Sequence, residues 1–147
     1  MEAVNSVTKG DKDDVASVYP KVSEAIAEAL GRDPGEVTLE SRLIEELNAE
    51  SIDLLDIVFR LERAFQVKIP RGQIVESARG DLTEEEFAQK GFVTPVGIAR
   101  LREHLSEVPA ERFQGPLKVG DIPLLFTVET FCKLVTRAVR AKGEARG

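Results

Sequence analysis

The most informative part of this chain is residues 47–70, which read LNAESIDLLDIVFRLERAFQVKIP. Apolar residues fill most positions from Ser51 to Phe65, and the remaining polar positions recur every three or four residues, which is the period of an α-helix. This polar stripe consists of Asp53, Asp56, Arg60 and Arg63. Pro70 keeps Ile69 out of the helical region. The pattern predicts a helix from about Ser51 to Phe65 whose surface is mostly covered by neighbours or left for partners.

Helical patterns on both sides of this stretch predict an all-α domain. Pro20 suits the first turn of an earlier helix, which Gly31 ends. Further on, Thr83 opens a Thr-x-x-Glu capping box, Thr94 precedes a proline that suits a first helical turn, and Thr127 starts a final amphipathic helix. No alternation typical of strands and no internal repeat is visible.

Composition and charge narrow the possible functions. The chain has 147 residues, of which 42% are hydrophobic, and this suits one domain with a substantial core. Its formal net charge is −6, which argues against nucleic acid as a partner, because phosphate contacts need a surplus of lysine and arginine. No apolar run approaches the roughly 18 residues that span a membrane, so no membrane insertion is expected.

The cysteine and the histidine offer little chemistry. The single cysteine, Cys132, cannot form an internal disulfide or a zinc site, so a cytoplasmic location is expected. Its helical spacing favours a place in the core of the last helix. The single histidine, His104, is expected on a solvated helix face. These residues predict neither a metal site nor a catalytic centre.

The expected organisation is one domain with short extensions. Residues 1–18 have weak periodicity and are expected to form a flexible leader. Residues 19–142 are expected to form the domain, and residues 143–147 a tail. Within the domain, residues 71–125 form a long region between the second and last expected helices.

Ser51 is the candidate functional residue. Taken alone, a serine at a helix start is most simply an N-cap. Its neighbours are more unusual, because Glu50 precedes it, Ile52 follows it and Asp53 lies two residues on. An Ile69-Pro70 pair then ends the helical run.

This combination resembles the acyl carrier protein family, whose motif is Asp-Ser-Leu. The resemblance also covers a first helix that ends in Leu30-Gly31, the long loop after it, and a last helix that opens after Thr127. It implies an antiparallel four-helix bundle with extra short helices inserted between the second and last helices. It also implies that Ser51 carries 4'-phosphopantetheine, so that the protein is a phosphoprotein and a carrier of acyl thioesters rather than an enzyme.

The resemblance implies partners and site residues as well. The partners are a phosphopantetheinyl transferase and acyl-loading, ketosynthase or acyltransferase enzymes, visited by a monomeric carrier. Steering onto basic enzyme surfaces requires charges around the serine. The candidates for docking are Glu50, Asp53, Asp56, Arg60, Glu62 and Arg63. The candidates for an acyl pocket or for the core are Ile57, Leu61 and Phe65, and the sequence leaves these two roles open.

Three functions fit this sequence. The first is an acyl carrier in fatty acid or lipid biosynthesis, specialised for a lipid A-type or other unusual lipid, in which residues 71–125 widen the pocket or select a partner. The second is a peptidyl, aminoacyl or polyketide carrier; Glu50 argues against a peptidyl carrier, because those proteins commonly place a neutral residue or histidine before the serine. The third is a helical adaptor that is never modified.

Overall fold

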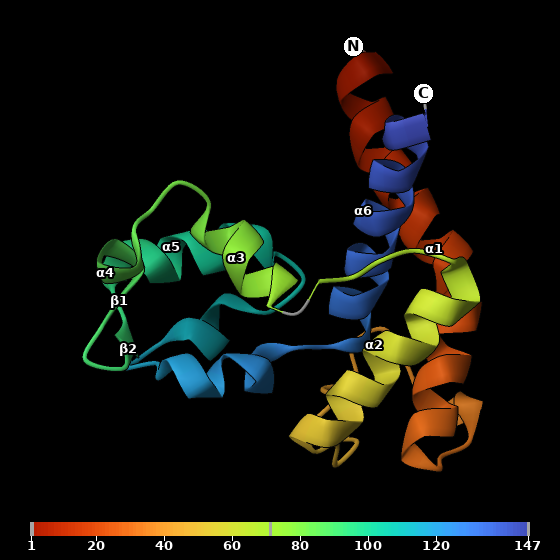
Figure 1. Cartoon of the computed structure of the whole chain (residues 1–147), viewed down its shortest axis with the longest axis horizontal. Coiled ribbons are helices and arrows are strands. Elements are labelled where there is room, and N and C mark those ends of the chain that lie inside the picture. Colours follow the sequence, from red (N-terminus) through yellow and green to blue (C-terminus); the bar gives the residue numbers. More distant parts are fainter. Residues whose placement is uncertain (1, 71, 147) are drawn as a thin grey trace.

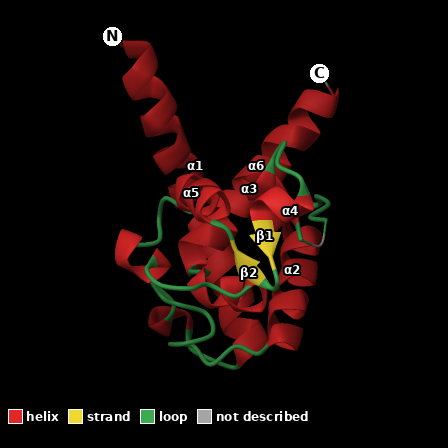
Figure 2. Cartoon of the chain, turned by 90° about the vertical axis from the view of Figure 1, so that its left-hand side faces the viewer, coloured by secondary structure: helices red, strands yellow, loops and turns green. Residues whose placement is uncertain are grey.

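The computed structural model describes residues 2–70 and 72–146, with side chains described over 14–70 and 72–143. Three helices form one half of the molecule: α1 (Glu2–Leu30), α2 (Ser51–Phe65) and α6 (Val128–Arg146) (Figure 1). Helix α1 packs against both α2 and α6. Figure 2 shows the outer ends of α1 and α6 diverging at the same end of the molecule.

The elements between α2 and α6 form a second half, called here the inserted lobe (residues 72–125) (Figure 1). Its helices α3 and α4 both pack against α5. A connector, residues 66–70 and 72, leads into the lobe, and residues 125–127 lead back to α6. In chain order the lobe contains α3 (Gln73–Arg79), α4 (Glu84–Phe87), β1 (Ala88–Gln89), β2 (Phe92–Val93), α5 (Pro95–His104) and the 3-10 helices η2 (Ala110–Phe113) and η3 (Val119–Leu125).

The predicted fold class is confirmed, since the molecule is a helical bundle with extra short helices between the second and last helices of the family pattern. The start of α1 differs from the prediction. This helix begins at Glu2 and runs through Pro20, so the segment expected to be a flexible leader belongs to the first helix. The Ser23 hydroxyl donates to the Pro20 carbonyl across 3.1 Å. The predicted domain boundaries stay predictions.

The hairpin β1–β2 was not expected from the sequence. Ala88 pairs with Val93, and Gln89 pairs with Phe92, in antiparallel register. Strands of two residues are too short to show alternation in a sequence. The turn between them has positive φ at Lys90 (54°) and at the following glycine (85°), as the tightest hairpin turns require.

The loop of residues 31–50, which includes the short 3-10 helix η1 (Pro34–Glu36), is fixed against the bundle. The Tyr19 hydroxyl of α1 donates to the Val37 carbonyl across 2.6 Å. The N–H groups of Val128 and Glu129, in the first turn of α6, donate to loop carbonyls across 3.0 Å. The loop therefore joins the core, whose fully buried side chains include Val22, Ile26, Val37, Leu43, Ile57, Leu61, Val128, Cys132 and Val135.

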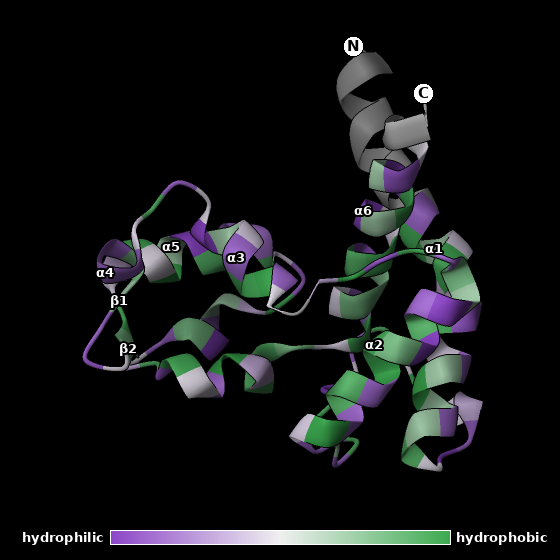
Figure 3. Ribbon diagram, in the orientation of Figure 1, coloured by the Kyte–Doolittle hydropathy of each residue, from purple (hydrophilic) through white to green (hydrophobic). Residues whose placement is uncertain are grey.

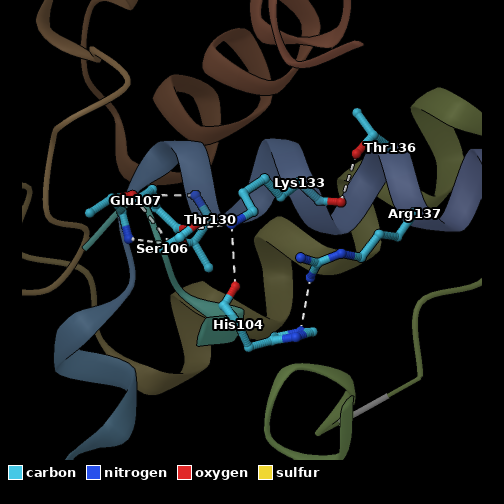
Figure 4. A network of polar contacts seen from close by, with 8 residues as sticks. His104, Ser106, Glu107, Thr130, Lys133, Thr136 and Arg137 are labelled. Atoms are coloured by element: carbon cyan, nitrogen blue, oxygen red, sulfur yellow. Dashed lines mark hydrogen bonds and ion pairs between the residues drawn. The ribbon is translucent and has the colours of Figure 1, made fainter. Parts of the chain in front are cut away.

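A polar network holds the end of α5 to α6 (Figure 4). The Glu107 carboxylate, whose side chain is 2% exposed, lies 2.6 Å from Lys133 Nζ and accepts a hydrogen bond from the Thr130 hydroxyl. Lys133 Nζ also donates to the His104 carbonyl across 3.2 Å. Arg137 Nη1 lies 2.9 Å from His104 Nε2. Two segments of the chain join the lobe to the bundle, and this network adds a third attachment between them.

None of the helices within residues 2–70 and 72–146 combines the length and the apolar composition that crossing a bilayer requires. Figure 3 shows that hydrophobic residues cover much of α2, as its narrow polar stripe predicts.

Candidate functional site

Ser51 is the first residue of α2, and the N-cap is Glu50. Glu50 has an extended backbone, with φ −102° and ψ 169°, and its N–H donates to the Asp53 carboxylate across 2.9 Å. The interpretation of Ser51 as an N-cap is therefore wrong. Its side chain is exposed, and among the described residues its hydroxyl makes no hydrogen bond. The hydroxyl is free to react or to be modified.

The loop that leads to Ser51 is held by backbone contacts. Asn48 has a φ of 60°, in the left-handed region that asparagine tolerates better than most residues. The side chain of Arg32 donates to the Leu47 carbonyl across 3.3 Å. The N–H of the buried Ala49 donates to the Leu43 carbonyl across 2.9 Å. The start of α2 thus has a defined position rather than hanging on a free loop.

A cavity of about 300 Å³, called here the first cavity, opens beside Ser51. It lies between α2, the connector, the inserted lobe and α6, and its walls are almost entirely apolar. Ser51 and Gln73 are the side chains with polar groups among the residues that line it. The other lining residues are Leu54, Leu55, Val58, Ile69, Pro70, Gly72, Ile74, Val75, Pro123, Phe126, Phe131 and Leu134.

The three residues proposed for a pocket or for the core do not line this cavity. Ile57 and Leu61 are fully buried in the core of the bundle. Phe65 is half-buried, and the Lys21 ammonium lies 5.6 Å from the centre of its ring. The cavity is lined instead by Leu54, Leu55 and Val58, which follow Ser51 at spacings of three, four and seven. That spacing places them on the same helix face as Ser51, and it was visible in the sequence.

The six candidate docking residues have different surroundings. Asp53 takes part in capping α2, and Glu62 accepts a hydrogen bond of 2.7 Å from the Ile69 N–H and so fixes the connector. Arg60 bridges Asp56 (3.2 Å) and Glu28 of α1 (3.4 Å). Glu50 and Arg63 are exposed. A docking role for these residues stays a prediction.

Two apolar side chains on α2 are exposed, and neither was among the docking residues that the sequence suggested. Ile52 is 71% exposed and Phe59 is 45% exposed. They lie seven residues apart and therefore on one helix face, together with Asp56 and Arg63. This outer stripe (Ile52, Asp56, Phe59 and Arg63) is accessible to a partner.

The inserted lobe also reaches the loop before Ser51. Arg112 of η2 lies 2.5 Å from a Glu45 carboxylate oxygen and donates to the Leu124 carbonyl across 3.0 Å. Arg42 contacts the same carboxylate across 3.2 Å. Part of the acidic charge near Ser51 is therefore balanced by the protein itself.

Cys132 and His104 lie away from this site. Cys132 is fully buried, as predicted, and burial raises the pKa of its thiol to about 12. His104 is half-buried and paired with Arg137, so the prediction of a solvated histidine is wrong. Burial lowers the His104 pKa, and the neighbouring Arg137 and Lys133 cations lower it further.

Comparison with known proteins gives the family of this chain. Residues 20–79 match the model of the phosphopantetheine attachment site family. An acyl carrier protein of Borrelia garinii subsp. bavariensis is 38% identical over 75 residues, which cover 50% of this chain and 94% of that protein. Acyl carrier protein AcpXL of Brucella melitensis is 38% identical over 84 residues, which cover 56% of this chain and 90% of that protein. No solved structure matches the chain significantly.

These findings confirm the predicted family, the cofactor and the role as a carrier rather than an enzyme. The match over residues 20–79 contains α2 and the loop before it. Family members interact with a phosphopantetheinyl transferase and with biosynthetic enzymes. The chain therefore belongs to the acyl carrier protein family and carries covalent 4'-phosphopantetheine as its prosthetic group.

Proposed function

We propose that Ser51 carries the phosphopantetheine arm and that this carrier serves the synthesis of a specialised lipid. The observation that supports the site most strongly is the position of Ser51, which is exposed at the start of α2 and lines the mouth of the first cavity. The hydroxyl has no partner among the described residues, so its modification breaks no existing contact. Ser51 also lies within the matched residues 20–79.

The backbone at the start of α2 suits a phosphodiester. The first N–H groups of a helix have no partner within the helix, and the helix dipole places partial positive charge there. Both features favour an anion on the Ser51 oxygen. When bound, the arm supplies a thiol that holds the acyl group as a thioester. The chain itself has only to present the arm and its cargo.

The first cavity suits an aliphatic acyl group. Leu54, Leu55 and Val58 form one wall on the helix face that carries Ser51, and Phe131 and Leu134 of α6 form another. Burial of a methylene group is favourable by about 0.8 kcal/mol. A fatty acyl chain gains more from such walls than an aminoacyl group, whose ammonium would have no acid among the lining residues. This favours an acyl carrier over an aminoacyl carrier.

The outer stripe of α2 is the proposed docking surface for partner enzymes. Ile52 and Phe59 supply apolar contacts, and Glu50 and Asp56 supply negative charge near Ser51. Charges of this kind steer a carrier toward basic surfaces without a large permanent interface. The predicted monomeric state and cytoplasmic location fit a carrier that visits several enzymes, and both stay predictions.

A specialised pathway is supported by two features. AcpXL of Brucella melitensis is one of the similar proteins. The inserted lobe supplies part of the wall of the first cavity, through Ile74, Val75 and Pro123. Because the lobe forms part of the cavity wall, its residues affect which acyl group the cavity accepts. We therefore place the protein in a dedicated lipid pathway, of which a lipid A-type pathway is an example.

The attachment site is tested by intact mass spectrometry. The purified protein is incubated with coenzyme A and a broad-specificity phosphopantetheinyl transferase. We expect the wild type and Ser77→Ala to gain one phosphopantetheinyl group, and Ser51→Ala to gain none. Ser77 is an exposed helical serine and so provides a matched control. Modification of Ser51→Ala would refute the assignment of the site.

The cargo is tested on protein isolated from its native cells. Cleavage of the thioester with hydroxylamine releases the acyl group, which mass spectrometry identifies. A fatty acyl group is expected. An amino acid or a polyketide intermediate would overturn the lipid pathway while leaving the attachment site intact.

A further inference from the structure

A second cavity of about 270 Å³ lies beside the same connector. One side of it is formed by the connector and the start of α3, and the other by α6. Its lining residues are Lys68, Ile69, Pro70, Gln73, Leu134, Arg137, Ala138 and Ala141.

The two cavities share a wall. Ile69, Pro70, Gln73 and Leu134 line both of them. The buried members of this wall are Ile69, which is 4% exposed, and Leu134, which is 5% exposed. The two cavities thus lie back to back, and side chains between the connector and α6 separate them.

The connector backbone is anchored on both sides of the wall that the two cavities share. Glu62 holds the Ile69 N–H across 2.7 Å, and Lys142 Nζ holds the Gln66 carbonyl across 2.6 Å. The Gln73 amide is drawn along α3 by a hydrogen bond of 2.9 Å to the Ser77 hydroxyl. Ile69 and Leu134 border both cavities, so a change of rotamer at either side chain is the smallest movement that could open a passage between them.

The size of the first cavity limits what it holds alone. An apolar cavity of about 150 Å³ holds benzene, which has six carbons, so about 300 Å³ holds roughly ten to twelve carbons. A longer chain must continue elsewhere or leave its end in water. The second cavity begins at the wall that the two cavities share, and it offers a similar volume.

The walls of the second cavity suit the end of such a chain. Ala138 and Ala141 leave an open apolar floor on α6, beside Leu134. Lys68 and Arg137 can bury their aliphatic stems along the cavity while their charged groups stay at the rim. No carboxylate is among the lining residues.

We propose that the second cavity binds the distal part of a long, unbranched acyl chain, which enters from the first cavity beneath the connector. This proposal rests on the proposed function, because the chain must first enter the cavity beside Ser51. It makes Leu134 and Ile69 the residues that determine how long a chain the carrier shelters.

The test loads Ser51 of the full chain from saturated acyl-coenzyme A of six, ten, fourteen or eighteen carbons, with a broad-specificity transferase. Thermal unfolding is then followed by scanning fluorimetry with an added dye. In the wild type, we expect the midpoint to rise by about 2 °C per buried methylene up to ten carbons and to keep rising from ten to eighteen.

Replacing either of two alanines that line the second cavity with a larger residue tests whether the effect comes from this cavity. Ala138→Phe fills the second cavity only. The unfolding midpoint of this variant should therefore rise with chain length as in the wild type up to ten carbons, and should not rise further with longer chains. Ala141→Leu fills the same cavity from an exposed position and should give the same plateau even if Ala138→Phe folds poorly. Ala64→Phe, an exposed substitution on α2 outside both cavities, should rise to eighteen carbons like the wild type.

The outcomes separate this proposal from the proposed function. A wild-type rise that stops near ten carbons would overturn the second cavity alone. A continued rise in both filled variants would overturn it as well. The absence of any rise between six and ten carbons would instead overturn the first cavity as the acyl site.

Discussion

The buried pair between Glu107 and Lys133 gives the sharpest prediction about the inserted lobe, and Glu107→Gln is the perturbation. Breaking a fully buried ion pair by removing one partner costs about 3–5 kcal/mol. Here the Lys133 side chain is 20% exposed and keeps the His104 carbonyl and the Ser106 hydroxyl as acceptors at 3.2 Å. We therefore expect a smaller loss, about 2 kcal/mol in the free energy of unfolding, or roughly 6 °C in the midpoint.

The assay is urea unfolding followed by circular dichroism, for the variants of a double-mutant cycle. Lys133→Met removes the other charge, and the double variant should lose less than the sum of the two single variants, because no charge is then left unpaired. Glu103→Gln is the matched control, since Glu103 is exposed on α5 and should change the free energy by less than about 0.5 kcal/mol. A Glu107→Gln protein as stable as this control would refute the reasoning that the pair anchors the lobe.

Three further predictions follow from single positions. Gly97→Ala should lower the free energy of unfolding, measured by urea titration, by about 1–3 kcal/mol, because a Cβ there would lie 2.4 Å from the Phe87 carbonyl oxygen. A Cβ at Gly120 would meet no atom within 4 Å, so the control Gly120→Ala should be nearly neutral. Ser51→Ala should abolish phosphopantetheinylation yet change thermal stability by less than about 0.5 kcal/mol, because the exposed hydroxyl has no described partner; a large loss would mean a structural role. The free energy of unfolding should fall as pH rises above about 9, because the unfolded state loses the Cys132 proton there while the folded state, with a thiol pKa of about 12, retains it. Urea titrations at several pH values should show a shallower fall in Cys132→Ala, which has no thiol at this position.

Much of the bundle could be predicted because its signals are local. The helix from Ser51 to Phe65 was predicted with the bounds that the structure shows, from apolar spacing and from the proline after it. The capping box at Thr83 was also predicted, and the structure shows both of its hydrogen bonds, at 2.8 and 3.1 Å. Periodicity, capping and proline geometry act within one turn or one dipeptide, so they can be read from sequence alone.

The features that could not be predicted depend on distant parts of the chain. The sequence suggested Ile57, Leu61 and Phe65 for the core or an acyl pocket, and the structure buries the first two fully and leaves Phe65 half-buried. Whether such residues meet the core or a cavity depends on where α1, α6 and the lobe are placed. His104 was misjudged for the same reason, since Arg137 of α6 covers it from 33 residues away. Glu50 as the N-cap escaped notice because glutamate is not among the preferred capping residues.

The composition of α2 follows from three separate demands on one helix. Ile57 and Leu61 are fully buried and belong to the core. Leu54, Leu55 and Val58 line the first cavity, which we propose to hold the acyl cargo. Ile52 and Phe59 remain exposed on the outer stripe. A helix with apolar residues on three faces has room for only a narrow polar stripe, and Asp53, Asp56 and Arg60 in that stripe make capping and ion-pair contacts.

This division makes the roles of the three faces separable by experiment. Large-to-small changes at Ile57 or Leu61 should destabilise the protein whether or not it carries an acyl group, by about 2–5 kcal/mol for alanine. A change at Val58 should instead reduce the stabilisation that an acyl chain adds, because the chain fills the space beside it. A change at Phe59 should leave both stabilities unchanged and weaken binding to partner enzymes. On the proposed function, contacts with the cargo and with partner enzymes account for the apolar residues on two faces of α2, and folding accounts for those on the third.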